Sequence, residues 1–207
     1  MESIVPYLSD CFLATLSEDE IRSGISEIFK TALIAGGSLW KDVSLKGGMC
    51  VDEGVILDII KNKAKIVNRD YFDAGERHIL NLGHTIGHAI ESCSFNRRSA
   101  CISHGDAVAA GLICELYLSV ELLGFPKKEA EESIAFIRHL FSPVADSCFH
   151  YASLLPFLLQ DKKNKKGELI FSLLKSPGEP VLNVKCDEKQ IKESLKYYQK
   201  VYKKKAE

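Results

Sequence analysis

The sequence has no marked excess of either charge, no paired cysteines and no secretory signal. Its 27 basic and 28 acidic side chains almost cancel, which argues against nucleic acid or an anionic membrane as the main partner. The seven cysteines are scattered without a C-x-x-C pair, and a chain of 207 residues needs no disulfide staples, so they indicate reduced thiols. The first twenty residues are acidic and lack a basic leader region. We expect a cytoplasmic protein.

The sequence also has no uninterrupted apolar run that could cross a bilayer. Its most apolar stretch, residues 107–123, contains Glu115 and Glu121, which a bilayer core would penalise. We therefore predict that this stretch is a buried helix.

Prolines are few, six in all, and none lies between residues 43 and 123. The long segments that this leaves carry apolar residues at helical spacing, which favours one mainly α domain over residues 1–207 with about seven or eight helices. Ser17 is typical of a helix N-cap with Glu20 as its capping-box partner, and Gly36-Gly37 predicts the end of that helix. Further helices are predicted over residues 53–68, from 81 onward, and over 105–123, 127–141, 152–159 and 188–202, with a small β-hairpin near residues 168–184.

The residues that could carry chemistry begin with two histidines one helical turn apart. His84 and His88 share a helix face, a spacing that suits either a metal site or two ordinary polar side chains, and the spacing alone favours the ordinary reading. A third histidine, His104, precedes a helix, and Glu27 lies on an earlier helix together with Lys30. Two histidines and a carboxylate make a zinc set that leaves one position for substrate, whereas a structural zinc would more often use cysteines.

Several cationic residues could surround an anionic substrate, because lysine and arginine recognise carboxylate and phosphate through charge-assisted hydrogen bonds. Taken singly, each is more often a solvated surface charge. The candidates are Lys30, Lys63, Arg77 and Lys162 or Lys163.

Several motifs occur in the order, and at the separations, typical of one protein family. The informative segments are residues 23–30, 63–67, 75–77, 81–91, 104–108 and 161–163. Together they resemble successive motifs of the 3-dehydroquinate synthases, and the match runs from about residue 10 to about residue 195. The string Asn81-Leu82-Gly83-His84-Thr85-Ile86-Gly87-His88 is the most specific part. The resemblance is to the C-terminal, metal- and substrate-binding half of these enzymes.

The resemblance implies an activity in the shikimate pathway and aromatic amino acid biosynthesis. Such enzymes are lyases that cyclise 3-deoxy-D-arabino-heptulosonate 7-phosphate to 3-dehydroquinate with release of phosphate, using NAD for a transient oxidation. It further implies a divalent metal, Zn²⁺ or Co²⁺, held by Glu27, His84 and His104. His88 would then be a proton-transfer group and no metal ligand.

By the same resemblance, Lys30 and Asp73 join His88 as catalytic residues. The substrate would be oriented by cationic and amide side chains, namely Lys30, Lys63, Arg77, Asn81 and Lys162 or Lys163. Two positions depart from the family pattern, since Asp73 and Asp106 stand where the family usually has glutamate.

The largest departure is an expected absence. The sequence has no glycine-rich dinucleotide turn after a strand, so we expect that the N-terminal NAD-binding domain of the family is absent and that the chain alone is inactive. Three explanations fit this expected absence: the chain is a domain prepared alone, one product of a split gene, or a truncated relative. A separate NAD-binding half is therefore a candidate partner, and a homodimer stays open.

Two rival functions remain at this point. One is another enzyme on the same scaffold, either a different sugar-phosphate cyclase or a metal-dependent polyol dehydrogenase; the motif Asn81-x-x-His84-x-x-x-His88 with Arg77 disfavours the dehydrogenases. The other is a non-catalytic helical module derived from this fold, which failure to retain zinc would support.

Overall fold

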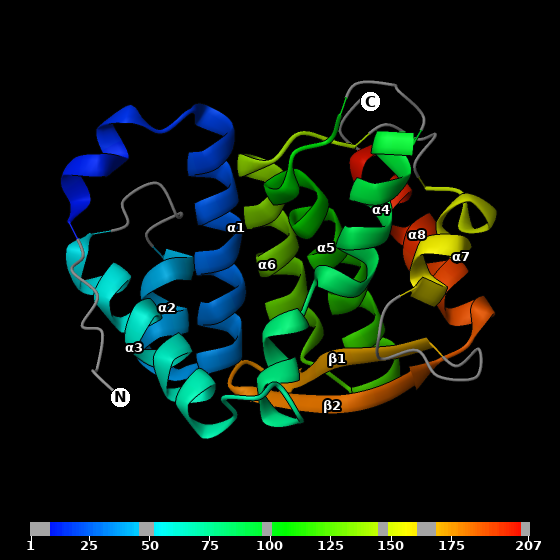
Figure 1. Ribbon diagram of the computed structural model, residues 1–207. Helices are drawn as coiled ribbons and strands as arrows, with labels where there is room; N and C mark the ends of the chain where they lie inside the picture. Colours follow the sequence, from blue (N-terminus) through cyan, green and yellow to red (C-terminus); the bar gives the residue numbers. More distant parts are fainter. Residues whose placement is uncertain (1–8, 46–51, 97–100, 145–148, 161–168, 204–207) are drawn as a thin grey trace.

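The computed structural model describes residues 9–45, 52–96, 101–144, 149–160 and 169–203 (Figure 1). Within these ranges the chain is mainly helical and has one two-stranded sheet, which confirms the predicted fold class. The elements are η1 (Asp10–Thr15), α1 (Glu18–Ala35), α2 (Gly37–Leu45), α3 (Glu53–Arg69), η2 (Glu76–Asn81), α4 (His84–Asn96), α5 (His104–Leu123), α6 (Lys127–Leu140), α7 (Tyr151–Gln160), β1 (Leu169–Ser176), β2 (Glu179–Cys186) and α8 (Glu188–Lys203), η denoting 3₁₀ helices. The bounds of α3 and of α5 to α8 agree with the predicted ones within one residue.

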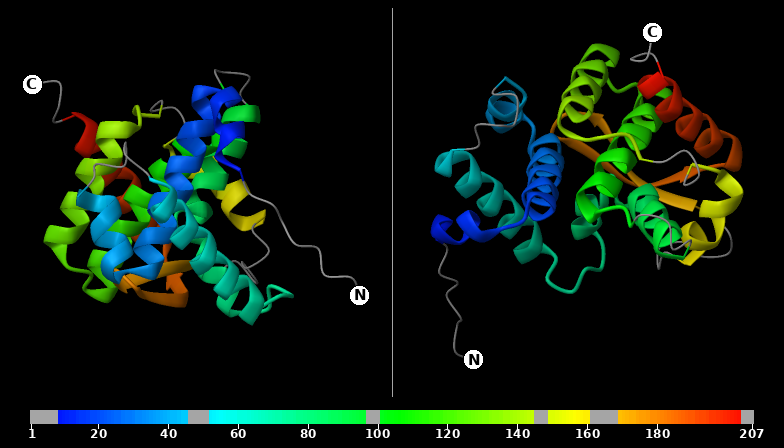
Figure 2. Two further views of the ribbon diagram at one scale, coloured as in Figure 1. Left: turned by 90° about the vertical axis from the view of Figure 1, so that its left-hand side faces the viewer. Right: turned by 90° about the horizontal axis from the view of Figure 1, so that it is seen from above.

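Helix α5 lies at the centre of the molecule. Helices α1, α4, α6 and α8 and strand β1 pack around it, and Figure 2 shows it between α1 and α8. Its residues Leu112, Ile113 and Leu116 are completely buried, as predicted for the apolar stretch. None of the described helices has both the length and the apolarity needed to cross a membrane. A polar side chain on the buried part of α5 must therefore find a partner inside the protein.

The start of α1 follows its sequence signals. The Ser17 hydroxyl accepts a hydrogen bond from the Glu20 backbone N–H, and the Glu20 carboxylate accepts one from the Ser17 N–H, so the predicted capping box is present. The helix ends at Gly36, whose φ of 64° favours glycine. A Cβ on Gly36 would lie 2.6 Å from the Cα of Gly178, so this end of α1 is held against the turn between β1 and β2.

Helix α2 was not predicted. The pair Gly36-Gly37 ends α1 as expected, but the interruption is one residue long, because α2 begins at Gly37 itself. The new helix is stabilised by packing, since Leu39, Trp40 and Val43 are all buried. Tertiary contact therefore outweighs the low helix propensity of the glycines.

The predicted hairpin is present, and it closes the core below the helices (Figure 1). Strands β1 and β2 pair antiparallel, with Leu169 opposite Cys186 and Ser176 opposite Glu179. The inner strand β1 carries the fully buried Phe171, Leu173 and Leu174. The sheet thus supports α5 and also contacts η2, the segment that leads to α4.

Helices α4 and α5 approach closely through glycines. A Cβ on Gly111 of α5 would lie 2.0 Å from the carbonyl oxygen of Gly83 and 2.8 Å from the backbone nitrogen of Gly87. A Cβ on Gly87 would lie 3.0 Å from the Ala107 carbonyl oxygen. Only hydrogen at these positions lets the two backbones meet, and this contact sets the distance between the histidines of α4 and the start of α5.

We expect Gly111→Ala to lower the free energy of unfolding by about 2 to 3 kcal/mol, because the added methyl group must push backbone apart. Urea denaturation of the purified chain measures the effect. Gly24→Ala in α1 is the matched control, since no atom from outside the surrounding turns of its own helix lies within 4 Å of its Cβ position. There the change removes a helical glycine and should be neutral or slightly stabilising. Equal stability of the two variants would refute the close packing of α4 on α5.

Candidate metal centre

The N-terminus of α4 is held by a buried carboxylate from the neighbouring helix. Glu115 of α5 is 0% exposed, and it accepts hydrogen bonds from the backbone N–H groups of Gly83 at 2.5 Å and of Ile86 at 3.3 Å. These are among the N–H groups that a helix start leaves without an intrahelical partner, and a negative charge there is favoured by the helix dipole. Glu115 thus holds the turn from which His84 projects.

The N-terminus of α5 is tied to α1 in a similar way. The Gly105 N–H donates to the Ser23 hydroxyl at 3.1 Å, and Arg22 forms an ion pair with Asp106. A Cβ on Gly105 would lie 2.6 Å from the Cα of Ser23, so the contact is tight. The next turn of α1 after Ser23 carries Glu27, which therefore lies beside the start of α5.

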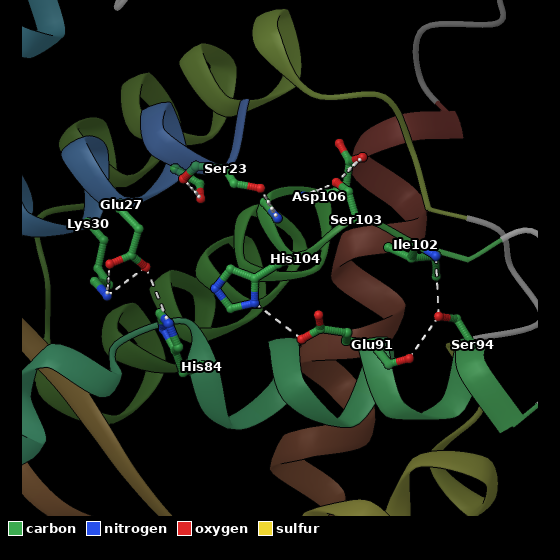
Figure 3. Close-up of polar contacts among 12 residues, drawn as sticks. Ser23, Glu27, Lys30, His84, Glu91, Ser94, Ile102, Ser103, His104 and Asp106 are labelled. Atoms are coloured by element: carbon green, nitrogen blue, oxygen red, sulfur yellow. Dashed lines mark hydrogen bonds and ion pairs between the residues drawn. The ribbon is translucent and has the colours of Figure 1, made fainter. Parts of the chain in front are cut away.

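The result is a convergence of three predicted ligands. Glu27 of α1, His84 of α4 and His104 of α5 each offer a ligand atom, and these atoms all lie within 4.8 Å of one another. The Nε2 of His84 is 3.3 Å from a Glu27 oxygen. Figure 3 shows the three side chains pointing toward one another from three helices. We call this group the inner set.

The hydrogen bonds of the two rings suit a metal ion. The Nδ1 of His84 lies 3.1 Å from the Leu82 carbonyl oxygen, which can only accept, so Nδ1 carries the proton. The Nδ1 of His104 likewise donates to the Glu91 carboxylate at 3.2 Å. In a neutral ring each Nε2 then presents a lone pair, and the His84 lone pair faces the Glu27 oxygen. A proton on Nε2 can also join His84 to Glu27, and a metal ion that binds nitrogen and oxygen can take the place of that proton, so the inner set fits such a metal.

Two lysines stabilise the charge on Glu27. The ammonium of Lys30 lies 2.8 and 2.9 Å from the two carboxylate oxygens, and that of Lys63 lies 3.5 Å from one of them. Burial raises the pKa of Glu27, but hydrogen bonds from His84 and Lys30 and their positive charges outweigh it, so the pKa lies well below the usual glutamate value. Burial also lowers the pKa of Lys30, an effect that the Glu27 charge opposes. Glu27 is therefore ionised, as a ligand must be.

His88 lies beside the inner set and is exposed. The centre of its ring is 5.0 Å from that of His84 and 5.9 Å from that of His104. His88, Glu91 and His104 form a second group whose ligand atoms lie within 4.8 Å of one another. We call it the outer set, and the two sets share His104.

Three further predicted site residues, Asp73, Arg77 and Asn81, lie in the segment that precedes α4. Asp73 occupies an exposed turn with φ of 56° and contacts His78, whose Nε2 lies 3.1 Å from the Asp73 carbonyl oxygen. The guanidinium of Arg77 donates to the Tyr71 carbonyl at 3.4 Å. Asn81 ends η2 and is partly buried. Lys162 and Lys163 lie outside the described residues.

Two residues of the site were not predicted from the sequence. Glu115 entered only as a charge that interrupts an apolar run, and Glu91 was part of a motif without a role of its own. Glu91 follows His88 by three residues and His84 by seven, a helical spacing that places it on their face, and this signal could have identified it. The partners of Glu115 are 29 and 32 residues away, so no local pattern indicates them.

Fold and site together define a helical domain with an open centre of two histidines and one carboxylate, and known proteins match it. Residues 24–164 match the family described as 3-dehydroquinate synthase C-terminal. The chain belongs to this 3-dehydroquinate synthase family, which confirms the resemblance found in the sequence motifs.

Curated relatives agree with this assignment. The 3-dehydroquinate synthase of Parabacteroides distasonis is 36% identical over 198 residues, covering 93% of this chain and 56% of the relative. That of Leptospira interrogans is 35% identical over 185 residues, covering 86% of this chain and 50% of the relative. The chain thus spans about half the length of the curated relatives it matches.

Solved structures share the fold at lower identity. A 2-epi-5-epi-valiolone synthase from Streptomyces hygroscopicus, with NAD⁺ and Zn²⁺ bound, superposes with a TM-score of 0.76 at 20% identity, covering 92% of this chain and 54% of that one. A 2-deoxy-scyllo-inosose synthase complexed with carbaglucose-6-phosphate, NAD⁺ and Co²⁺ gives a TM-score of 0.71 at 20% identity, covering 86% and 51%. The fold is that of the sugar-phosphate cyclases.

Proposed function

We propose that this chain is the metal- and substrate-binding half of a 3-dehydroquinate synthase, which cyclises 3-deoxy-D-arabino-heptulosonate 7-phosphate to 3-dehydroquinate with release of phosphate. The observation that carries the proposal is the convergence of Glu27, His84 and His104 from three helices in a chain of this family. The ring tautomers and the ionised carboxylate suit Zn²⁺ or Co²⁺ as the resident ion. When bound, such an ion acts as a Lewis acid toward substrate hydroxyl and ketone oxygens.

The chain's own residues would position the substrate and move protons. His88, exposed beside the inner set, is the proposed proton-transfer group. Among the cationic residues that the structure describes, Lys63 suits a substrate anion best. Its side chain is 50% exposed, and its Nζ lies 3.5 Å from a carboxylate oxygen of Glu27. Lys30 is almost completely buried against Glu27, so we assign to it first the orientation of that ligand.

The other proposed substrate residues are Arg77 and Asn81, with Asp73 as a further catalytic group and Lys162 or Lys163 as cations outside the described residues. Phosphate and carboxylate on the substrate are the groups that Arg77 and the lysines would bind. In this proposal catalysis rests mainly on positioning, since the reacting groups belong to one substrate molecule.

A second candidate function is a different sugar-phosphate cyclase. The observation that favours it is the structural likeness to valiolone and inosose synthases, both cyclases with other names and products. Relatives that are 35 to 36% identical carry the name 3-dehydroquinate synthase, and we therefore prefer that activity. A panel of seven-carbon and six-carbon sugar phosphates, tested on the reconstituted enzyme, separates the two.

We further propose that NAD is held by an N-terminal half that these 207 residues do not include. The sequence offers no glycine-rich dinucleotide turn, and hydride transfer requires the nicotinamide within a near-attack distance of roughly 3 to 3.5 Å of the substrate carbon. The NAD⁺-bound valiolone synthase is about twice the length that this chain covers.

We expect the purified chain with Zn²⁺ and NAD to form no measurable 3-dehydroquinate, and turnover to appear when an N-terminal half is supplied. The N-terminal half of the Parabacteroides distasonis relative, added in trans or fused ahead of Met1, provides the missing part. A fusion carrying His84→Ala controls for activity contributed by the added half. Turnover by the chain alone would refute the proposal that an N-terminal half holds NAD. An inactive fusion that still binds zinc would count against the synthase proposal.

A further inference from the structure

We propose that the outer set, His88, Glu91 and His104, is a second position for a divalent transition-metal ion, alternative to the inner set and weaker than it. The proposal rests on donor geometry alone and does not depend on the proposed reaction. Three observations support it: His88 and Glu91 share a face of α4, His104 belongs to both sets, and His104 contacts Glu91.

The outer donors are brought together by α4 and the start of α5. His88 and Glu91 are three residues apart on α4 and therefore share a face. His104 is the first residue of α5, and its Nδ1 lies 3.2 Å from a Glu91 oxygen. Ligand atoms of all three residues lie within 4.8 Å of one another.

The distances between donor atoms match those of ligands on one zinc ion. Two atoms bound to zinc at about 2.0 to 2.2 Å with tetrahedral angles are roughly 3.3 to 3.6 Å apart. The inner pair, His84 Nε2 and Glu27, is 3.3 Å apart, and the outer pair, His104 Nδ1 and Glu91, is 3.2 Å apart. Each pair is thus close to one edge of a zinc tetrahedron. Two imidazoles and one carboxylate favour Zn²⁺ or Co²⁺ over Mg²⁺ or Ca²⁺, which prefer oxygen ligands.

The shared imidazole makes the two positions alternatives. Figure 3 shows His104 between the Glu27–His84 pair and Glu91, with one ring nitrogen directed to each side. An ion in the inner set uses Nε2 and leaves the proton on Nδ1, where it is donated to Glu91. An ion in the outer set would use Nδ1 and move the remaining proton to Nε2. A neutral ring has one nitrogen lone pair to offer, so it serves one ion at a time.

The outer position is the more open of the two. The two carboxylates differ little, since the side chain of Glu27 is 28% exposed and that of Glu91 is 23% exposed, but His88 is exposed whereas His84 is only 12% exposed. Water competes better for an open site, and exposed side chains lose more freedom when they bind. We therefore place the ion in the inner set of the wild-type chain and in the outer set when the inner one is broken.

The test is a titration with Co²⁺, followed by calorimetry and by the visible absorption of the bound ion. The wild-type chain should bind one equivalent. His84→Ala should still bind one equivalent, at least tenfold more weakly and with a changed absorption spectrum, because the ion now sits in the outer set.

Two matched double variants then decide which set holds the ion in His84→Ala. Adding Glu27→Gln removes the remaining inner carboxylate and should change the affinity less than twofold. Adding Glu91→Gln removes the outer carboxylate and should weaken binding at least tenfold. The reverse pattern would show residual inner binding and would overturn the proposal, as would a His84→Ala chain that binds no Co²⁺.

Circular dichroism shows whether each carboxylate variant folds. If one does not, a second pair of double variants still tests the proposal. The double variant His84→Ala, His88→Gln should bind Co²⁺ at least tenfold more weakly than His84→Ala. The double variant His84→Ala, His139→Gln should bind it as tightly as His84→Ala, since His139 is an exposed residue of α6. Equal affinities in this pair would also overturn the proposal. None of these readouts uses catalytic activity, so the proposal and the synthase function fail independently.

Discussion

Replacing Glu115 with alanine should destabilise the chain by about 3 to 5 kcal/mol and weaken its zinc binding at the same time. The change leaves the buried N–H groups of Gly83 and Ile86 without the acceptor that they use now, and each unsatisfied donor costs about 1 to 3 kcal/mol. It also removes a negative charge that acts on the buried Lys30. Because His84 is the first residue of α4, loosening the first turn displaces a ligand of the inner set.

Urea denaturation gives the loss of stability, and zinc retained after dialysis gives the loss of binding. Glu121→Ala is the matched control, since Glu121 is an exposed glutamate on the same helix and its removal should change either quantity little. Glu115→Gln should fall between the two, because the amide oxygen can accept from one N–H while its NH₂ group meets the other. If Glu115→Ala behaves like Glu121→Ala, then the carboxylate does not hold the start of α4.

Much of the fold was predictable because its signals are local. The capping box of Ser17 and Glu20, the apolar spacing along α5 and the turn before β2 each lie within a few residues, and the structure follows them. Helix α2 was missed for the opposite reason. Gly36 and Gly37 look locally like a stop, and what restarts the helix is the burial of Trp40 and its neighbours against distant parts of the chain.

The site, too, was predictable only where its signals are local in the sequence. The spacing of His84 and His88 is readable from one helix, but it does not decide between a metal site and two ordinary histidines. Residue spacing alone could not bring in Glu27 and His104, because they come from other helices and meet His84 only through packing. Their residue types made them candidates, and the family motifs assigned them to one metal together with His84. Neither spacing nor motifs indicated the partners of Glu115, which depend on how α5 lies beside α4.

The second large effect is expected at His88. In the fusion that restores the N-terminal half, His88→Ala should lower turnover by about 10² to 10⁴-fold, the usual contribution of a positioned acid–base group, while bound zinc stays near one equivalent. The physical reason is the division of the histidines described above. His84 and His104 offer Nε2 lone pairs to the inner set, whereas His88 is exposed beside them and is not one of its donors.

Metal content and turnover must be measured on the same preparation, because only their separation tests the role. His139→Ala, an exposed histidine on α6, controls for a general effect of removing an imidazole, and it should leave both quantities unchanged. His84→Ala provides the opposite pattern, in which turnover is lost and the metal ion is bound at least tenfold more weakly, in the outer set. A pH–rate profile adds a readout that a structural role would not move, since loss of an acid–base group removes its limb from the profile. If His88→Ala loses zinc in proportion to activity, then His88 belongs to the resident metal's ligands and the proton-transfer role is wrong.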